Sequence, residues 1–479
     1  MNRTDPTSLE TLTARLREAL GEDAVIAAPE SRYHGDRAEP GAADARFLLV
    51  LPHDVEGVQA TLRLAHETGT PVVSRGAGSG LSGGTVAIDG GMVLSLERLH
   101  TIREIDPLDE VAVVDAGVIT ADLSEALAPL GFFYAPDPAS VAISTIGGNI
   151  ATNAGGLHCA KYGVTRESVL ALEVVLADGT LLRTGHRSLK GVTGLDLTQL
   201  LIGSEGTLAV VVAATVRIRP VPVARRTVLA RFSTTAHAAD GVNAISRSPV
   251  RPAATELLDS GAVADIDAHN GSRLGADPAA EAIGTHHPDG PRSSGGAVLL
   301  LELDGYGIRE QTADLVDILT GAGGSVQVIE DEAEAEHLWE LRRTSHAAGG
   351  GRRRLNEDVA VPKSRLAQML TALEEIGHRH GVATSAIAHA GDGNLHPSLS
   401  LPGVPEDPSA ALPAPILAAA DEVVRTALEL GGTISGEHGI GTAKQRWLDL
   451  ELSPTSRSLQ HRLKQAFDPR GLLNPGKAL

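Results

Sequence analysis

The chain has 479 residues, a formal net charge of −19 and a single cysteine. This length exceeds what one hydrophobic core supports, so several structural units are expected. The acidic balance argues against a nucleic-acid partner, because no excess of cations is available to replace the counterions of phosphates. One cysteine, Cys159, excludes an internal disulfide and a cysteine-ligated iron–sulfur cluster within the chain. No run of 18 apolar residues occurs, so a cytoplasmic protein without a membrane-spanning segment is expected.

The first half alternates short β-rich runs with helical patterns. An amphipathic helix capped near Ser8 is predicted first, and a helix capped by Asp54 follows the strand "ARFLLVLP". A later helix is predicted to open at Thr120. The run "VLALEVVLADGTLLRTG" predicts two strands joined by a turn at Asp178-Gly179.

The second half mixes strands and helices without tight βαβ spacing, which favours an α+β fold. Helices are predicted at 236–246, 308–323, 363–381 and 411–432, and a strand is predicted at "GAVLLLELDG". The Gly-, Pro- and Ser-rich stretch 268–297 is predicted to be an exposed loop.

Two glycine-rich segments are candidates for binding a cofactor. The first, "PVVSRGAGSGLSGG" at 71–84, follows a strand and leads to another β-like run. A dinucleotide fingerprint or a hydrolase elbow would have to open a helix, so both readings are disfavoured. Successive glycines instead suit a nest of backbone N–H groups for a diphosphate. The second segment, 136–168, has little helical or strand periodicity, and such long structureless segments are usually functional.

The stretch "HAGDGNLHPSL" at 389–399 predicts a hairpin that carries two histidines. If Asp392-Gly393 is a two-residue turn, His389 faces His396 directly, close enough for both imidazoles to reach one ion. A solvent-facing pair is the alternative. "GGTISGEHGIGT" places Glu437 and His438 between glycines, and two histidines with one carboxylate would leave an open position on zinc.

Four segments in consistent order resemble the FAD-binding oxidoreductases of the vanillyl-alcohol oxidase superfamily: "PVVSRGAGSGLSGG", "STIGGNIATNAGG", "LIGSEGTLAVV" and "FDPRGLLNPGK". Within it they resemble the branch of D-lactate dehydrogenase, the glycolate oxidase catalytic subunit and D-2-hydroxyglutarate dehydrogenase. The resemblance implies a PCMH-type FAD-binding domain of two α+β subdomains, a cap domain with an antiparallel sheet and helices, and a C-terminal segment that returns to the FAD domain. The expected boundaries are 1–40 (helical), 41–223 (FAD domain), 224–430 (cap) and 431–479 (C-terminal segment).

The resemblance also implies where the cofactor binds. Covalent members carry a histidine in the first loop, where this chain has Ser79, so noncovalent FAD is expected. Cys159 is interpreted as a packing residue. The implied FAD-binding residues are Arg75, Gly76, Ala77, Gly78, Ser79, Gly80, Ser82, Pro136, Asp137, Ser144, Thr145, Gly147, Gly148, Asn149, Thr152, Asn153, Gly155, Gly156, Glu205, Gly206, Val211 and Asn474.

For the reaction centre, the resemblance assigns His389, His396 and Glu437 to a divalent metal, with Zn²⁺ favoured, and His438 to the base. Arg342, with Arg343 second, is expected to bind a substrate carboxylate. Asn356 and Ser398 stand where the hydroxyglutarate enzymes carry a lysine and an asparagine, which favours a shorter substrate.

The expected function is therefore FAD-dependent oxidation of a D-2-hydroxy acid, best D-lactate, with hydroxyglutarate or glycolate as alternatives. Electrons would pass to an external cytochrome, quinone or electron-transfer flavoprotein. A metal-dependent hydrolase without flavin is the rival of another class. Homodimerisation, peripheral membrane association and membership of a larger complex stay open.

Overall fold

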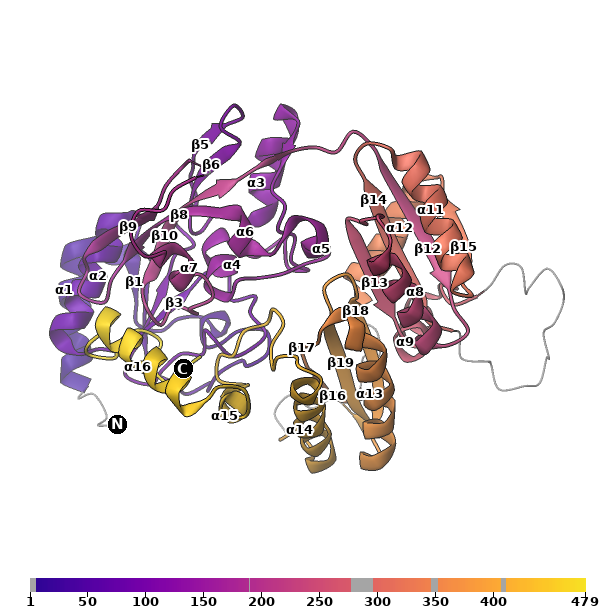
Figure 1. Ribbon diagram of the computed structural model, residues 1–479. Coiled ribbons are helices and arrows are strands. Elements are labelled where there is room, and N and C mark those ends of the chain that lie inside the picture. Colours follow the sequence, from indigo (N-terminus) through magenta and orange to yellow (C-terminus); the bar gives the residue numbers. More distant parts are fainter. Residues whose placement is uncertain (1–5, 189, 277–295, 346–351, 406–410) are drawn as a thin grey trace. The chain divides into compact units, whose positions relative to one another are not determined.

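The computed structural model describes residues 6–188, 190–276, 296–345, 352–405 and 411–479 (Figure 1). The chain divides into two compact units. Unit 1 comprises residues 1–156, 163–221 and 437–479, and unit 2 comprises residues 157–162 and 222–436. The predicted loop at 268–297 falls largely outside the described residues.

The first sheet of unit 1 has the strand order β1 (Val25–Ile26), β2 (Leu48–Val50), β4 (Met92–Ser95), β3 (Val72–Arg75). Strand β2 runs parallel to β4, and β4 runs parallel to β3. Helix α2 (Val55–Thr68) connects β2 to β3, as a parallel pair requires. Asp54 caps this helix by accepting the N–H of Gly57, so the predicted cap is confirmed.

The second sheet of unit 1 is antiparallel. Its order is β5 (Ile102–Asp106), β6 (Val111–Asp115), β10 (Val210–Arg217), β8 (Val169–Val175), β9 (Leu181–Gly185). Strands β8 and β9 form the predicted hairpin, in which Val175 pairs with Leu181 and Gly179 has a positive φ of 85°. Helix α3 (Thr120–Leu127) begins at the predicted residue. The shorter elements are β7 (Phe132–Phe133), β11 (Arg219–Pro220), α4 (Ile146–Thr152), α6 (Thr165–Ser168) and α7 (Leu197–Leu201).

Both ends of the chain belong to unit 1. Helix α1 (Pro6–Leu20) packs against α2 and buries Leu12 and Leu16 completely or nearly so. Ser8 lies inside this helix, so the predicted cap at Ser8 is wrong; a proline suits the first helical turn because its missing N–H has no partner there anyway. The C-terminal segment contributes α15 (Leu448–Glu451) and α16 (Pro454–Phe467), and Leu473 then bridges to Val72.

Unit 2 is built on an antiparallel sheet with the order β15-β12-β14-β13-β18-β19-β16, and β17 pairs with β19. Strand β14 is buried at every position, which shows that both faces of the sheet centre are covered. The strands are β12 (Arg225–Arg231), β13 (Ala254–Leu258), β14 (Val298–Asp304), β15 (Ser325–Ile329), β16 (Arg352–Asn356), β17 (Val359–Ala360), β18 (Ala383–His389) and β19 (Asn394–Pro405).

Helices cover this sheet. Helices α13 and α14 pack against each other and against β18 and β19, and α8 and α11 pack against each other beside β12 and β14 (Figure 1). Their bounds, with those of the other helices of unit 2, are α5 (Cys159–Tyr162), α8 (Thr235–Arg247), α9 (Ser260–Asn270), α11 (Ile308–Gly321), α12 (Glu332–Arg343), α13 (Leu366–His380) and α14 (Ala414–Glu429).

A short piece of the second glycine-rich segment, Leu157–Tyr162, belongs to unit 2. The Lys161 ammonium forms an ion pair with Asp304 at the end of β14, and the Tyr162 hydroxyl donates to the same carboxylate at 2.5 Å. Segment 136–168 therefore is not structureless: it carries α4, α5 and α6. These helices have four to seven residues, too short to give a visible periodicity in the sequence.

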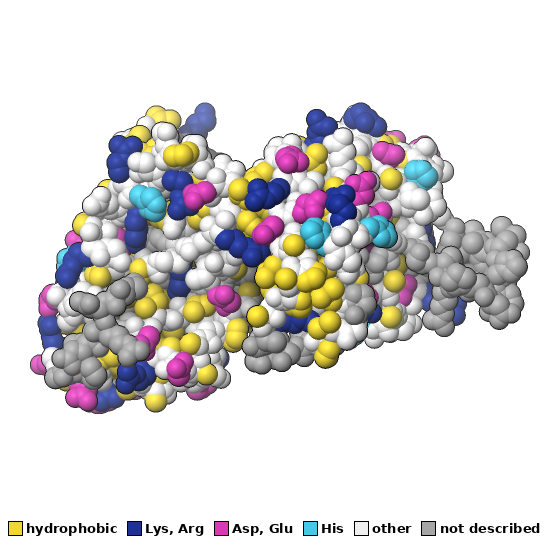
Figure 2. Space-filling model, turned by 90° about the horizontal axis from the view of Figure 1, so that it is seen from below, with side chains coloured by type: hydrophobic (Ala, Val, Ile, Leu, Met, Phe, Trp, Pro, Cys, Tyr) yellow, Lys and Arg dark blue, Asp and Glu magenta, His cyan; other side chains and the backbone are white. Residues whose placement is uncertain are grey.

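The architecture confirms the predicted fold class: two α+β subdomains, a second unit with an antiparallel sheet and helices, and a C-terminal segment that returns to the first unit. No helix among the described residues is long and apolar enough to cross a membrane. On the face shown in Figure 2, basic and acidic side chains of the described residues are interspersed. This distribution gives that face no extended basic surface for a polyanion.

Candidate active site

The first glycine-rich loop forms a cradle of backbone N–H donors. Within the described residues, no amide from Gly76 to Ser82 donates a hydrogen bond to another protein group. The loop lies between β3 and β4 and opens no helix. Gly78 has a φ of 72°, a conformation that glycine adopts without strain. Several adjacent amides without a protein acceptor suit a diphosphate, so the loop fits the cofactor expected there.

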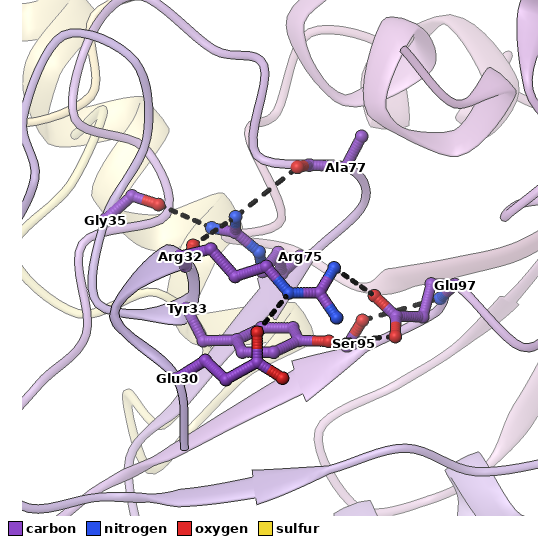
Figure 3. Close-up of polar contacts among 8 residues, drawn as sticks. All are labelled: Glu30, Arg32, Tyr33, Gly35, Arg75, Ala77, Ser95 and Glu97. Atoms are coloured by element: carbon purple, nitrogen blue, oxygen red, sulfur yellow. Dashed lines mark hydrogen bonds and ion pairs between the residues drawn. The ribbon is translucent and has the colours of Figure 1, made fainter. Parts of the chain in front are cut away.

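Arg75 supports this loop from within the protein (Figure 3). Its guanidinium donates to the backbone carbonyls of Gly35 (2.5 Å), Arg32 (2.6 Å) and Ala77 (3.3 Å). It also donates to the Thr85 hydroxyl at 3.0 Å. The side chain is buried, and its Cζ lies 5.5 Å from the centre of the Tyr33 ring. Arg75 therefore shapes the loop through protein contacts, and a direct contact with the cofactor stays a prediction.

The second loop meets the first at Thr145. The Thr145 hydroxyl caps α4 by accepting the Gly148 amide at 3.1 Å. A Cβ added to Gly76 would lie 2.3 Å from the same hydroxyl, and a Cβ on Gly147 would lie 2.6 Å from the Cβ of Ala116. Only glycine allows these backbones to approach so closely. The remaining residues of the predicted cradle in this loop, Pro136, Asp137, Ser144, Asn149, Thr152, Asn153, Gly155 and Gly156, lie on α4 or on the chain that flanks it.

Glu205 connects the cradle to the C-terminal segment. Its carboxylate accepts the amides of Ile440 and Gly441, each at 2.8 Å. Burial raises the pKa of Glu205, and the two amide hydrogen bonds act in the opposite direction. The Asn474 side chain donates to the Glu205 carbonyl at 2.5 Å and accepts the Ser74 amide at 3.2 Å. Of the other predicted residues, Gly206 directly follows Glu205, and Val211 is the second residue of β10.

The same C-terminal loop rests on the first glycine-rich loop. The amides of Thr442 and Ala443 both donate to the Ser82 carbonyl, at 2.9 and 3.1 Å. A Cβ on Gly441 would lie 2.0 Å from that carbonyl oxygen. Unit 1 therefore brings together the first loop, Glu205 and the "GEHGIG" segment that carries Glu437 and His438.

In unit 2 the histidine hairpin forms, but its predicted register is wrong. His389 pairs with Asn394, and His396 pairs with Ile387. The turn spans Ala390–Gly393, because the amides of Asp392 and Gly393 both donate to the His389 carbonyl. The register differs from the predicted one by two residues, which leaves every side chain on the face it was expected to occupy. His389 and His396 are therefore diagonal neighbours, with ring centres 5.1 Å apart.

Each of these histidines has a buried carboxylate behind it. His389 Nδ1 lies 2.8 Å from Glu256 Oε1, across the β13–β18 pair. His396 Nδ1 lies 3.7 Å from Asp358 Oδ1. The side chains of Glu256 and Asp358 are both 0% exposed. Asp358 also accepts the Ser435 hydroxyl at 2.8 Å and the Gly436 amide at 2.9 Å.

Arg342, the first choice for binding a substrate carboxylate, already pairs with a carboxylate of the protein. Its Nε donates to Glu256 Oε2 at 2.6 Å, and its Nη2 lies 2.5 Å from the same oxygen. The side chain is only 2% exposed. Burial raises the pKa of Glu256, but Arg342 and His389 outweigh it and hold this pKa below its ordinary value. A contact between Arg342 and substrate stays a prediction.

The other predicted substrate residues occupy two places. Asn356 on β16 and Ser398 on β19 are directly paired across the antiparallel ladder. Ser398 stands two residues from His396, so all three side chains share one face of the sheet. Arg343, at the end of α12, is 36% exposed and forms an ion pair with Glu336.

The donor set for a metal assembles where the chain leaves unit 2. Gly436 lies against the hairpin, since a Cβ there would be 2.1 Å from Asn394 Nδ2. Glu437 is bonded directly to it. One atom each of His389, His396 and Glu437 lie within 4.8 Å of one another, and the same holds for Asp358, His396 and His438. Two imidazoles and a carboxylate are a donor set that zinc accepts, so these residues fit the ion.

Two residues of this centre were not predicted. Glu256 is the one acidic residue in the apolar strand "ATELL", and Asp358 is an acidic residue of "NEDVAVP" that becomes fully buried. A charged residue inside an apolar strand could have marked Glu256, because unpaired buried charges are costly.

Comparison with family models gives two matches. Residues 221–478 match the C-terminal domain of FAD-linked oxidases, and residues 48–185 match an FAD-binding domain. The first match alone covers more than half of the chain.

Curated relatives cover most of the chain. The glycolate oxidase subunit GlcD of Bacillus subtilis (strain 168) is 38% identical over 434 residues, which are 90% of this chain and 88% of the relative. A D-lactate dehydrogenase of Archaeoglobus fulgidus is 34% identical over 94% of this chain and 96% of its own. The mitochondrial cytochrome-type D-lactate dehydrogenase of Arabidopsis thaliana is 30% identical over 98% of this chain and 80% of its own.

Solved structures support the same fold. p-Cresol methylhydroxylase with bound substrate superposes with a TM-score of 0.77, covering 99% of this chain and 97% of that one at 18% identity. An alkyldihydroxyacetonephosphate synthase gives a TM-score of 0.74 at 18% identity, with 98% of this chain and 86% of that one covered. The chain belongs to the family of FAD-linked oxidases and is a relative of the glycolate oxidase subunit GlcD and of D-lactate dehydrogenases.

Proposed function

We propose that this FAD-linked oxidoreductase is a dehydrogenase that oxidises a D-2-hydroxy acid to the 2-oxo acid, with D-lactate as the best candidate. The observation that carries the proposal is the group formed by His389, His396 and Glu437, whose donor atoms lie within 4.8 Å of one another. Relatives named for glycolate and D-lactate support the substrate class.

Bound FAD supplies an acceptor for a hydride, and a divalent ion, best Zn²⁺, supplies a Lewis acid. His389, His396 and Glu437 would hold the ion, and the substrate hydroxyl and carboxylate could then bind it if it takes five ligands. His438, next to Glu437 in the chain, would accept the hydroxyl proton, a role for which imidazole is well suited near neutral pH. The amides of Gly76–Ser82 would bind the cofactor diphosphate, and Ser79 in place of a histidine supports noncovalent binding.

The size of the substrate is inferred from one face of the unit 2 sheet. Asn356 and Ser398 face each other there, and neither carries a positive charge. A second, distal carboxylate would find no cation at these two positions, which favours D-lactate over a five-carbon diacid. Arg342 and Arg343 stay the candidates for binding the single carboxylate. The electrons would then leave to an external cytochrome, quinone or electron-transfer flavoprotein.

The test is anaerobic flavin reduction. Purified protein should be yellow, and acid precipitation should release free FAD. Its visible absorbance should bleach on addition of D-lactate, more slowly with glycolate, and least with D-2-hydroxyglutarate. A protein that carries FAD but is reduced by none of these acids would contradict the proposed substrate class.

A further inference from the structure

Three buried charged side chains lie near the two histidines of unit 2. Glu256 and Asp358 have no role in the proposed chemistry, and Arg342, a candidate for the substrate carboxylate, is already paired with Glu256. Glu256 and Asp358 are completely buried, and Arg342 is nearly so. Burying a carboxylate without a partner is costly, so residues of this kind are kept where the charge is used or balanced.

We propose that Glu256 and Asp358 are positioning residues for the metal: Glu256 holds His389 by its Nδ1 so that Nε2 is directed to the ion, Asp358 places a buried negative charge behind His396, and Arg342 balances the charge of Glu256. The inference deepens the proposed function and rests on it, because it requires that His389 and His396 bind a metal.

The geometry is tightest at His389. An Nδ1 that lies 2.8 Å from a carboxylate oxygen carries the proton and donates it, which leaves Nε2 with the lone pair that a metal requires. The strand register enforces this contact, because Glu256 and His389 are directly opposed in the β13–β18 ladder. A carboxylate behind a ligating histidine fixes its ring and raises its basicity.

Asp358 Oδ1 lies 3.7 Å from His396 Nδ1, beyond hydrogen-bond distance, so Asp358 acts on His396 through its charge. The Ser435 hydroxyl and the Gly436 amide fix its other oxygen, and Gly436 is bonded to Glu437. Asp358 thus connects one histidine ligand to the segment that supplies the carboxylate ligand.

Arg342 explains how Glu256 can stay ionised inside the sheet. Its guanidinium meets Glu256 Oε2, whereas His389 meets Oε1, so the carboxylate is shared between a fixed cation and the ligand. Removal of Glu256 alone would leave Arg342 as an unpaired buried charge, so both must be changed together.

The experiment measures zinc affinity in FAD-loaded protein from which metal has been removed by a chelator. Zinc is titrated in competition with a chromophoric chelator. The variant Glu256→Gln/Arg342→Gln removes both charges. We expect its zinc affinity to fall 10- to 100-fold, with an unchanged flavin spectrum. In a His389→Ala background the same pair of substitutions should change zinc affinity no further.

Glu302→Gln is the matched control. Glu302 lies on the neighbouring strand β14, is 9% exposed and also contacts a histidine, His158, at 3.2 Å. It touches neither predicted ligand, so its substitution should leave zinc affinity unchanged. Asp358→Asn provides a second, independent test, with an expected loss of zinc affinity of about tenfold, and it serves if the double variant does not fold.

The outcomes separate the two claims. The inference is overturned, and the metal site stands, if the folded double variant binds zinc as tightly as the wild-type protein. The same holds for Asp358→Asn if that variant is used in its place. If wild-type protein binds no divalent ion, the metal part of the proposed function fails and the inference fails with it.

Discussion

The carboxylate of Glu205 accepts the backbone amide of Gly441 at 2.8 Å, although 236 residues separate the two in sequence. The second carboxylate oxygen accepts the Ile440 amide. These bonds fix the backbone two and three residues beyond His438. Glu205, predicted from the resemblance to bind cofactor, therefore also anchors the loop that carries the proposed base.

Glu205→Gln should slow flavin reduction more than it lowers FAD content. Glutamine has one carbonyl oxygen, so one of the two amides loses its acceptor, at a cost of about 1.5 kcal/mol or more for a hydrogen bond to a charged group. We expect a roughly tenfold slower reduction rate per bound FAD, measured by anaerobic stopped-flow absorbance. Glu104→Gln, at an exposed ion pair with Arg187, is the control. An unchanged rate per FAD would remove the anchoring role.

Arg75→Met should destabilise unit 1 and reduce FAD retention. The substitution leaves the buried carbonyl of Gly35 and the partly buried carbonyl of Arg32 without their donor, and each such loss costs about 1–3 kcal/mol. We expect the free energy of unfolding to fall by about 3 kcal/mol, measured by urea denaturation, with less FAD per protein. Arg32→Met removes exposed ion pairs with Glu30 and Glu97 and a contact with the face of the Tyr33 ring, and should cost only about 1 kcal/mol. Equal losses in both variants would contradict this account.

Gly155→Ala should disturb Glu437. A Cβ at position 155 would lie 2.5 Å from Glu437 Oε2, closer than real contacts allow. The carboxylate must move, and we expect a weaker zinc affinity with FAD still bound. Gly321→Ala, where the added Cβ meets nothing within 4 Å, controls for the substitution itself. Normal zinc affinity in Gly155→Ala would show that Glu437 is not a ligand or tolerates displacement.

Stability should depend on pH through Asp259. Burial raises its pKa to about 7, against the hydrogen bonds that it accepts from the amides of Ala262 and Ala386. Between about pH 4 and pH 7, the folded protein therefore holds a proton that the unfolded chain has lost. The contribution of Asp259 to the free energy of unfolding is fully present below about pH 4 and is lost as pH rises through 7. The loss is roughly 4 kcal/mol.

Asp259→Asn tests this dependence, because asparagine does not titrate. The difference in unfolding free energy between wild type and variant should move in favour of the variant as pH rises from 5 to 8, as measured by chemical denaturation at each pH. A constant difference would show that the pKa of Asp259 is not raised.

The sequence predicts the elements well where one local cause decides them, and less well where tertiary packing decides. The Asp54 cap and the Asp178-Gly179 hairpin depend on neighbouring residues and form as predicted. The histidine hairpin has a four-residue turn, in which the amides of Asp392 and Gly393 both donate to the His389 carbonyl. The residue types at Asp392-Gly393 alone predict a two-residue turn. Even so, the period of two along each strand places both imidazoles on the predicted face.

The partners of the site were harder to predict. Glu256 is 133 residues from His389, and only the order of strands in the unit 2 sheet brings them together. The resemblance implied Arg342 as a substrate residue, and the structure pairs it with Glu256, a residue of the same sheet. Pairing across distant strands is a property of topology, which local pattern does not encode.

The most direct test of the central claim is single-turnover flavin reduction by D-lactate in protein freed of metal by a chelator. The account predicts that the FAD stays bound and oxidised, and that one equivalent of Zn²⁺ restores bleaching in the wild type but not in His396→Ala. If metal-free protein is reduced by D-lactate at the wild-type rate, the group of His389, His396 and Glu437 does not serve the reaction.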